Sequence, residues 1–299
     1  MKLMILDGNS IVNRAFYGIR MLNAPDGTPT NAVYGFLTIF QRILELERPQ
    51  AVCVAFDVHA PTFRHEQYAL YKAQRKPMPE ELVVQMPLLK QTLDHMGIRR
   101  LELAGWEADD LLGTISRRAD EHGDTCVVVT GDRDSLQLVG GGTTVMLVST
   151  RMGQTTYQTY DTAAFREKYG FDPIRLIDLK ALMGDSSDNI PGVPGIGPKK
   201  ASALIAQYGS LDEVIAHADE VKGKMGENLR AHIDDALLSR KVATIRTDAP
   251  VELDFEATSF PAFSADEVSA ALGTLGITAM QNRFLALIGG EGGAAASTF

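Results

Sequence analysis

The stretch TCVVVTGDRDS, from Thr125 to Ser135, has the composition of a buried strand that runs directly into acidic residues. Its apolar residues are β-branched and continuous rather than alternating, which is typical of a strand covered on both faces of a parallel sheet. Three further runs share this character: KLMIL (2–6), AVCVAF (51–56) and TTVMLV (143–148). Helical patterns, such as 32–46 and 107–121, separate the runs. The sequence therefore predicts an α/β fold built on a parallel sheet.

Three of these runs are followed by an aspartate, namely Asp7, Asp57 and Asp132. One aspartate in such a place is most often a helix cap or a turn residue. In an open parallel sheet, however, ligands bind at the edge formed by the carboxyl ends of the strands. If the three strands are neighbours, their carboxylates meet at that edge, and we interpret them as functional.

Two other segments are rich in acid. In GWEADDLLGT, Glu107, Asp109 and Asp110 occupy the first turn of a predicted helix, where capping and the helix dipole favour acid. Three acids in four residues exceed what a cap requires, and Glu107 and Asp110 project together at i and i+3. Asp134 follows Asp132, and the stretch MGDSSDNIPGVPGIGPKKA (183–201) adds Asp185 and Asp188.

Clustering of these acids predicts a metal site. The chain of 299 residues carries a net charge of −9, so setting nine carboxylates aside leaves the rest balanced. Clustered carboxylates repel one another unless cations neutralise them, and hard divalent cations prefer oxygen ligands. Two Mg²⁺ or Mn²⁺ ions about 4 Å apart suit hydrolysis of a phosphodiester. The six histidines form no close pair, and Cys53 and Cys126 lie in apolar runs.

A basic segment follows Asp57: HAPTFRHEQYALYKAQRKPMPEEL (59–82). Its cations suit phosphates, and its aromatic side chains suit stacking on unpaired bases. The alternative is an amphipathic surface helix with a solvated basic face. We expect the nucleic-acid contacts from Arg64, Lys72, Arg75 and Lys76, with Tyr68 and Tyr71 interleaved.

The glycine-rich stretch after Asp188 matches no common phosphate or calcium loop. A P-loop fails because Pro198 stands where the lysine must be, and the spacings of a dinucleotide loop and an EF-hand fail too. What remains is two helices joined by a turn, whose second helix exposes backbone N–H groups that can bind phosphate. An ordinary helix hairpin with solvated lysines is the alternative. The candidate contacts are Gly192, Gly195, Gly197, Lys199 and Lys200.

Composition sets the class of protein. The chain is 45% hydrophobic and 22% charged, which suits one large or two modest globular domains. No apolar run reaches the ~18 residues of a membrane span, and Asp7 comes too early for a signal peptide. We therefore expect no membrane partner. The two cysteines show no disulfide or zinc spacing and predict a cytoplasmic protein.

The quoted motifs, together with ILDGNSIVNRAFYG (5–18), resemble the 5′ nuclease of bacterial DNA polymerase I and its flap endonuclease relatives. The resemblance runs in order from residue 1 to about 288. It implies a PIN-like core with a helical arch, a C-terminal helix–three-turn–helix part, and 5′→3′ exonuclease and 5′-flap endonuclease activity on DNA in replication and repair. It also implies a nucleoid-associated bacterial protein, which in a longer chain would precede a polymerase.

The resemblance also assigns roles to residues. Asp7, Asp57, Glu107, Asp109 and Asp110 would surround one metal ion, and Asp132, Asp134, Asp185 and Asp188 a second. Arg14 would lie near the reacting strand, and Lys72 and Arg75 would contact the scissile phosphate in an arch that admits a free 5′ end. The hairpin would grip duplex DNA, and in relatives it can hold K⁺ through turn carbonyls.

We expect residues 1–178 to form the core, with the arch at about 58–90, and residues 179–288 to form the helical DNA-binding part. Residues 248–257 read as an extended crossing segment, 277–287 as a last helix, and 289–299 as a mobile tail of linker composition. The rival functions are a PIN-like ribonuclease and a noncatalytic module that binds DNA structures.

Overall fold

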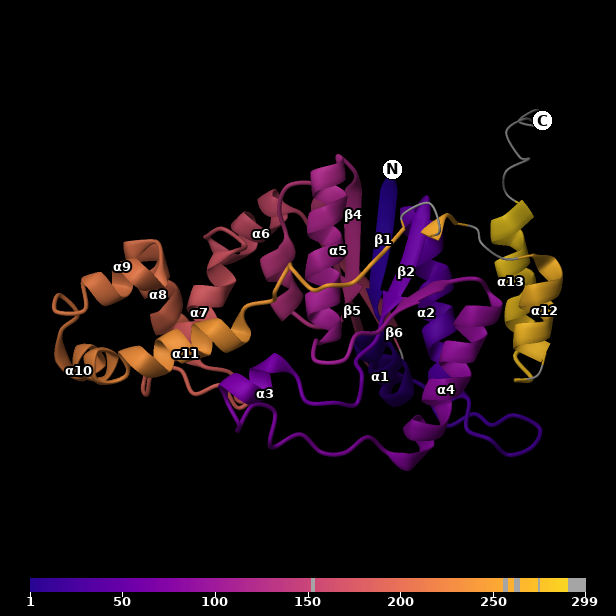
Figure 1. The fold of residues 1–299 in the computed structure, drawn as a ribbon, viewed down its shortest axis with the longest axis horizontal. Helices are drawn as coiled ribbons and strands as arrows, with labels where there is room; N and C mark the ends of the chain where they lie inside the picture. The colour runs from indigo at the N-terminus through magenta and orange to yellow at the C-terminus, as the bar shows by residue number, and fades with distance from the viewer. Residues whose placement is uncertain (152–153, 255–257, 261–263, 274, 290–299) are drawn as a thin grey trace.

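The fold, seen in a computed structural model, is described for residues 1–151, 154–254, 258–260, 264–273 and 275–289. Within these residues the centre of the molecule is a six-stranded sheet of order β3-β2-β1-β4-β5-β6 (Figure 1). The strands are β1 (Lys2–Asp7), β2 (Ala51–Ala55), β3 (Arg99–Leu101), β4 (Thr125–Thr130), β5 (Thr143–Arg151) and β6 (Gln154–Tyr160).

The three strands that end in aspartate are neighbours, as expected. β1 lies between β2 and β4 and is parallel to both, with Asp7 opposite Ala55 and Leu6 opposite Val129. The parallel strands β1, β2, β4 and β5 confirm the four predicted runs. Two strands were not expected: β3 has only three residues, and β6 is an antiparallel edge strand of sequence QTTYQTY. An edge strand with one solvated face carries polar residues, so it has no apolar run to mark it.

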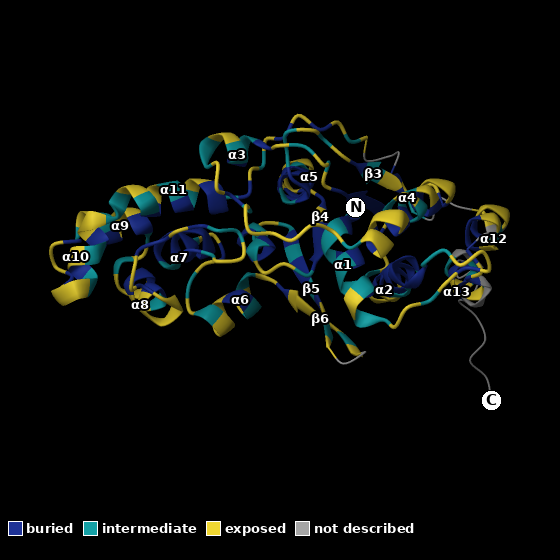
Figure 2. Ribbon diagram, turned by 90° about the horizontal axis from the view of Figure 1, so that it is seen from below, coloured by how far each residue is buried: buried dark blue, intermediate teal, exposed yellow. Residues whose placement is uncertain are grey.

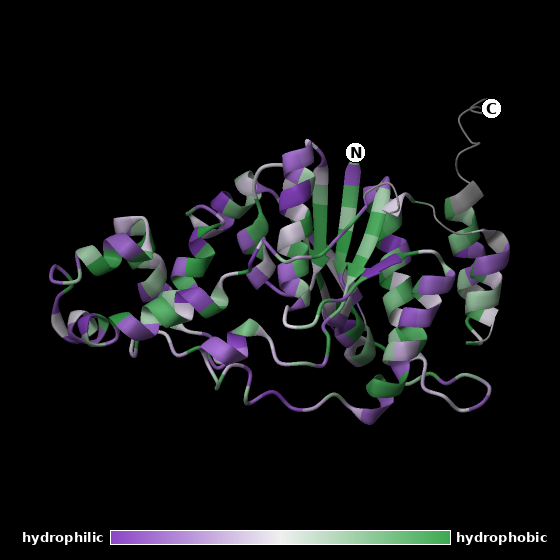
Figure 3. Cartoon of the chain, viewed as in Figure 1, coloured by the Kyte–Doolittle hydropathy of each residue, from purple (hydrophilic) through white to green (hydrophobic). Residues whose placement is uncertain are grey.

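Both faces of the sheet are covered, which explains the continuous apolar runs. Leu3 and Ile5 point into a core shared with α5 (Ala108–His122), whereas Met4 and Leu6 point into a second core beneath α1 (Gly8–Gly18) and α2 (Asn31–Glu47). The central strand β4 is accordingly mostly dark in the burial colouring (Figure 2), and β1, β2 and β4 are mostly apolar along their length (Figure 3), whereas the edge strand β6 is partly exposed.

A helical part extends from one side of the sheet (Figure 1). After α6 (Thr162–Tyr169), it contains α7 (Arg175–Met183), α8 (Pro198–Tyr208), α9 (Leu211–Ala216), α10 (Gly223–Ala231) and α11 (Ile233–Ala243). Leu182, Ile205 and Leu229 belong to the same buried cluster as the α5 face of the sheet. The helical part is thus packed onto the core, and α7 carries part of the candidate site.

The chain then returns to the far side of the sheet. Residues 248–254 have no regular secondary structure, as expected for a crossing segment, and residues 255–257 lie outside the described part. The last helices are α12 (Ala265–Gly273) and α13 (Thr278–Gly289). Val268 and Phe284 join the core beneath α2, so in packing terms these helices belong with the sheet and not with the part expected over 179–288. The expected tail from residue 290 onward lies outside the described residues.

The arch segment is less helical than expected. α3 (Phe63–Gln67) is five residues long, residues 68–79 form turns and extended chain, and α4 (Glu80–His95) begins after Pro79. Pro77 and Pro79 cannot donate the backbone hydrogen bonds of a helix interior. Among the described helices, none is long and apolar enough to cross a membrane.

Candidate metal and nucleic-acid site

The carboxyl ends of β1, β2 and β4 bring three aspartates to one edge, and two of them also accept a hydrogen bond from an N–H group in the first turn of a helix. Asp7 accepts a hydrogen bond from the Ser10 N–H (2.9 Å) and another from the Thr130 hydroxyl (2.8 Å). Asp57 accepts one from the Ala108 N–H (2.7 Å) at the start of α5. The capping and functional interpretations of the sequence are therefore compatible, because the caps fix the directions of carboxylates at the edge.

The acidic turn of α5 lies against this edge. Glu107 is the N-cap of the helix and accepts hydrogen bonds from the Lys72 ammonium (2.7 Å) and the Tyr71 hydroxyl (3.0 Å). Asp109 is half-buried, and Asp110 is fully buried. The acids expected in one group are thus brought together, but their surroundings differ.

A second acidic group lies at the start of the helical part. Asp134, Asp185 and Asp188 each offer an oxygen, and the three oxygens lie within 4.8 Å of one another. Asp134 opens the 3₁₀ helix η1 (Asp134–Leu138), and the two other aspartates follow α7. Oxygen ligands at this spacing fit a hard divalent cation.

Lys180 is a site residue that sequence reasoning missed. It projects from α7 and forms ion pairs with both Asp134 and Asp185, although it is 9% exposed. The signal was present, since Lys180 interrupts the apolar run LIDLKALM, and a buried lysine needs a charged partner. Thr130 was missed as well; it bonds to Asp7 and accepts the Asp132 N–H.

The electrostatics of the edge favour a bound cation. Burial, together with the charge of Asp57, raises the pKa of Asp7 from 3.8 to about 7, despite the hydrogen bonds from Ser10 and Thr130. Burial and the charges of Asp7 and Asp132 raise the pKa of Asp109 well above its ordinary value. Burial and Asp132 likewise raise the pKa of Asp134 to about 6, against the effect of Lys180.

Two carboxylates, Glu107 and Asp185, lie beside a basic side chain and have a lowered pKa instead of a raised one. Burial alone would raise the pKa of Glu107, but Lys72 and Arg64 more than offset it, so the pKa lies below its ordinary value. Burial is offset in the same way at Asp185 by Lys180 and Ser187. The protein's own cations therefore neutralise part of the cluster.

These shifts predict how stability depends on pH. A carboxyl whose folded pKa is raised binds a proton more tightly in the folded protein, so its stabilising contribution is lost as pH rises through that pKa. For Asp7 and Asp134 the window runs from about pH 4 to pH 7. We expect the melting temperature in EDTA to fall by a few degrees between pH 5 and pH 8, and Mg²⁺ to remove the decline because it takes the place of the protons. Asp7→Asn should flatten the slope in EDTA, and an unchanged slope would contradict the assignment.

The basic segment lies across the acidic edge. Lys72 reaches Glu107, and Arg75 pairs with Asp188 (2.7 Å) while its side chain stays 52% exposed. The Lys72 N–H also bonds to the Asp188 carbonyl oxygen (3.0 Å), and Lys72 has a left-handed backbone with φ of 54°. Both residues expected at the reacting phosphate are therefore at the cluster.

Two of the expected nucleic-acid contacts in this segment are buried. Arg64 is 2% exposed and pairs with Asp110, so its guanidinium does not face solvent in this arrangement. Tyr71 is 4% exposed, and its hydroxyl donates to Glu107. Tyr68 is half-buried and Lys76 is exposed. Their contacts with DNA stay predictions.

Arg14 lies beside the first group of carboxylates. It projects from α1 and donates a hydrogen bond to the Gly131 carbonyl oxygen, next to Asp132. Burial lowers the pKa of its guanidinium, although the charges of Asp132 and Asp7 oppose this. Arg14 Nε is buried, with no hydrogen-bond partner among the described residues.

The glycine hairpin has a buried and an exposed half. Gly192 is buried with φ of 62°, and a Cβ there would collide with the backbone of Gly184, so its role here is packing. Gly195, Gly197, Lys199 and Lys200 are exposed, and Gly197 is the N-cap of α8. The Gly195 carbonyl accepts a hydrogen bond from Lys200 Nζ (2.8 Å), and the Pro194 carbonyl accepts one from the Asn228 amide (2.7 Å).

A parallel sheet with carboxylates at its carboxyl edge, followed by a helical part that completes the acidic group, defines a PIN-like nuclease fold. The chain belongs to the 5′-3′ exonuclease family. Residues 2–170 match the family's "5'-3' exonuclease, N-terminal resolvase-like domain", and residues 171–266 match its "5'-3' exonuclease, C-terminal SAM fold".

The sequence is similar to bacterial proteins that are named DNA polymerase I. The chain is 45% identical to DNA polymerase I of Bacillus caldotenax over 276 residues, and 43% identical to that of Bacillus subtilis over 283. These matches cover 92% and 94% of this chain but 31% and 32% of the relatives, so the chain spans about a third of their length.

Solved structures share the fold. Bacteriophage T5 5′-exonuclease with bound zinc has a TM-score of 0.67 at 23% identity, covering 96% of this chain and 99% of the other. The catalytic core of Rad2 in complex with DNA has a TM-score of 0.60 at 18% identity, covering 96% and 92%.

Proposed function

We propose that this chain is a divalent-metal-dependent 5′→3′ exonuclease and 5′-flap endonuclease that hydrolyses DNA in replication and repair. One observation carries the proposal: one group of carboxylates lies at the edge of the sheet and a second at the start of the helical part, and Lys72 and Arg75 of the basic segment pair with one carboxylate of each group. Such an edge can bind cations and a phosphate at once, which hydrolysis of a polyanion requires.

The residues present fit Mg²⁺ or Mn²⁺. Oxygens of Asp134, Asp185 and Asp188 lie close enough to share an ion. The raised pKa values of Asp7 and Asp134 mark carboxylates whose burial and acidic neighbours are not fully offset by the protein's own cations. Bound divalent ions would supply a nucleophilic hydroxide at neutral pH and would neutralise charge on the phosphate. We assign the ions to the two groups named from the resemblance, except that Asp110 is left out because both of its oxygens already accept hydrogen bonds from the protein.

The chain's own cations would handle the phosphate. The ammonium of Lys72 and the guanidinium of Arg75 would become available to a phosphate at the same edge if bound cations neutralised their present partners, Glu107 and Asp188. Arg14, which donates to the Gly131 carbonyl oxygen next to Asp132, would add a third cation at the edge. Charge supplied where negative charge develops lowers the barrier most.

The hairpin would hold the duplex. Exposed N–H groups at the start of α8 and the exposed Lys199 and Lys200 suit backbone phosphates. The Rad2 core was solved with DNA, and the T5 enzyme with DNA and metal ions, which supports DNA as the ligand. K⁺ at the hairpin stays a prediction, because two turn carbonyls already accept protein hydrogen bonds.

The wider setting is part of the proposal. Bacterial DNA polymerase I relatives continue well beyond the matched region, which supports a polymerase C-terminal to this domain and a place on chromosomal DNA in the cytoplasm. The division into a core at 1–178 and a helical part from 179 also stays a prediction; the two family models divide at residues 170 and 171.

One assay tests the function. A 5′-flap duplex and its all-RNA counterpart are incubated with Mg²⁺ and, separately, with EDTA. We expect cutting of the DNA flap in Mg²⁺ only. Preference for RNA would favour a PIN-like ribonuclease, and binding without cutting in both tubes would favour a noncatalytic module.

Lys199→Ala combined with Lys200→Ala should weaken binding of every duplex sequence. Phosphate contacts act by releasing counterions, so the slope of log K against log[salt] should become shallower by about 1 to 2. Lys224→Ala, an exposed lysine on α10 paired with Glu227, is the control. A wild-type slope in the double variant would make Lys199 and Lys200 solvated bystanders.

A further inference from the structure

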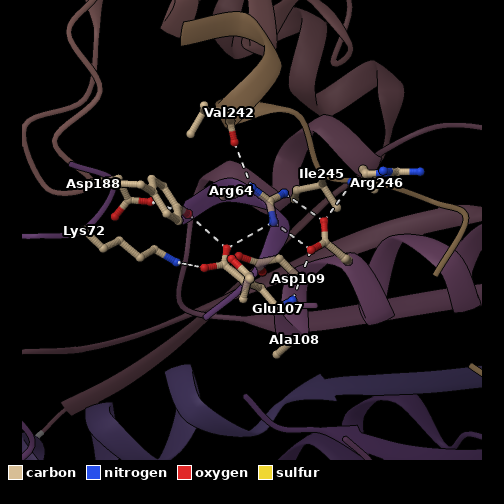
Figure 4. Close-up of polar contacts among 12 residues, drawn as sticks. Arg64, Lys72, Glu107, Ala108, Asp109, Asp188, Val242, Ile245 and Arg246 are labelled. Atoms are coloured by element: carbon tan, nitrogen blue, oxygen red, sulfur yellow. Dashed lines mark hydrogen bonds and ion pairs between the residues drawn. The ribbon is translucent and has the colours of Figure 1, made fainter. Parts of the chain in front are cut away.

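Arg64 has the most complete hydrogen bonding among the cations near the site. Its Nε donates to the Val242 carbonyl (2.9 Å), and Nη2 donates to Asp110 Oδ1 and to the Thr244 carbonyl (both 2.8 Å). Nη1 donates to Asp110 Oδ2 (2.7 Å) and lies 3.3 Å from Glu107 Oε2. The five N–H groups of a guanidinium therefore face five acceptors. Figure 4 shows Arg64 between Val242 and Glu107.

The carboxylate of Asp110 has its hydrogen-bond acceptor positions filled in the same way. Besides the two bonds from Arg64, its Oδ1 accepts the Arg246 N–H (2.9 Å) and its Oδ2 accepts the Glu107 N–H (3.1 Å). A carboxylate has about four acceptor positions, and Asp110 is 0% exposed. No position is left through which this carboxylate could bind a metal ion.

The pair joins three parts of the chain that are far apart in sequence. Arg64 lies on α3 at the base of the arch, Asp110 lies in the acidic turn of α5, and the acceptors Val242 and Thr244 lie at the end of α11. Because the Glu107 N–H bonds to Asp110, the same pair fixes the N-cap from which Glu107 and Asp109 project.

We propose that Arg64 and Asp110 are positioning residues that hold the first acidic group in register with the arch and the helical part, and that Asp110 does not bind metal. The proposal rests on the proposed function only in taking that acidic group as a metal site. It reassigns two residues whose types alone suggested a DNA contact and a metal ligand.

Lysine cannot replace Arg64 in this role. An ammonium is a point charge with three donors and cannot span two carboxylate oxygens and two carbonyls in one plane. Arg64→Lys keeps the charge and most of the volume, so it tests geometry rather than electrostatics. Partners one step removed from a metal ion are typically worth 10–100-fold in metal affinity.

Trp106 provides a local reporter, since it is the chain's single tryptophan. Its ring contacts Phe63 (centroids 5.3 Å apart) and lies 4.9 Å from the guanidinium carbon of Arg246. Phe63 precedes Arg64 in the chain, and the Arg246 N–H bonds to Asp110. Tryptophan emission therefore shows whether the region around the Arg64–Asp110 pair is folded in a variant, independently of catalysis.

The test measures Mn²⁺ binding to the DNA-free protein by electron paramagnetic resonance of the free ion, with Trp106 emission as the check of folding. We expect Arg64→Lys to lower Mn²⁺ affinity 10–100-fold with the wild-type number of bound ions. Adding Asp110→Asn to that variant should lower it by less than about two-fold more, because both residues act through one contact. The control is Arg100→Lys, which disturbs a bidentate pair with Asp94 (2.6 and 2.8 Å) outside the cluster.

Wild-type affinity in folded Arg64→Lys would overturn the proposal, as would an additive loss in the double variant. If Arg64→Lys does not fold, Asp110→Asn alone decides: lower affinity with the full number of ions supports positioning, and loss of one bound ion overturns it. A wild-type chain that binds Mn²⁺ without cutting flap DNA would reject the proposed function and leave this inference standing.

Discussion

Asp132→Asn should reduce cleavage of a 5′-flap substrate by more than about 100-fold while affinity for the same DNA changes by less than about two-fold. Asp132 follows β4 and is exposed at the edge of the sheet. Its charge acts on Asp7 and Asp109 in the first acidic group and on Asp134 in the second. Because its charge reaches carboxylates of both groups, Asp132 should influence the ions expected in both.

The size of the effect follows from the role. Removing a partner one step away from a metal ion typically costs 10–100-fold, so loss of a carboxylate of the metal site, whether it binds directly or through water, should cost at least as much. DNA affinity should survive because the expected phosphate contacts are cations that the substitution does not touch.

The measurement is single-turnover cleavage in Mg²⁺, beside equilibrium binding in Ca²⁺ to suppress chemistry. Asp161→Asn is the control, since Asp161 caps α6 through the Ala164 N–H (2.7 Å) outside the cluster and asparagine caps equally well. Near-normal cutting by Asp132→Asn would contradict the metal assignment.

Lys72→Ala and Arg75→Ala should each lower the cleavage rate by roughly 100-fold, about 2.7 kcal/mol, with a much smaller loss of affinity. Negative charge on the phosphate grows toward the transition state, so a cation that meets it there contributes more to rate than to binding. Arg75→Lys should recover only part of the loss, because a point charge replaces a planar fork.

Two matched controls separate this role from ordinary surface pairing. Lys72 lies 2.7 Å from Glu107 and 4.8 Å from the Tyr71 ring; Lys90 lies 2.7 Å from Glu102 and 5.0 Å from the Phe56 ring. Lys90→Ala thus removes the same kinds of contact without touching a cluster carboxylate. For Arg75, Arg166→Ala removes an exposed pair with Asp172. Equal losses of rate and affinity in Lys72→Ala or Arg75→Ala would mean that these residues only help to hold DNA.

Much of the fold was predictable from local pattern. A strand buried on both faces must be apolar throughout, so β1, β2, β4 and β5 were visible as runs. Since parallel strands present their carboxyl ends to one edge, Asp7, Asp57 and Asp132 could be placed together without coordinates. The polar edge strand β6 and the docking of α13 beneath α2 could not, because neither leaves a mark in the composition of its own segment.

The α/β fold, the acidic edge and the basic segment beside it could be predicted, because each depends on residues close together in the chain or on a rule of strand order. The role of individual charges became visible only in the folded chain. Arg64 and Asp110 are 46 positions apart, and Lys180 is 46 from Asp134. What a carboxylate or a guanidinium can do depends on which partners already occupy its acceptor or donor positions, and those partners come from distant segments that only the folded chain brings into contact.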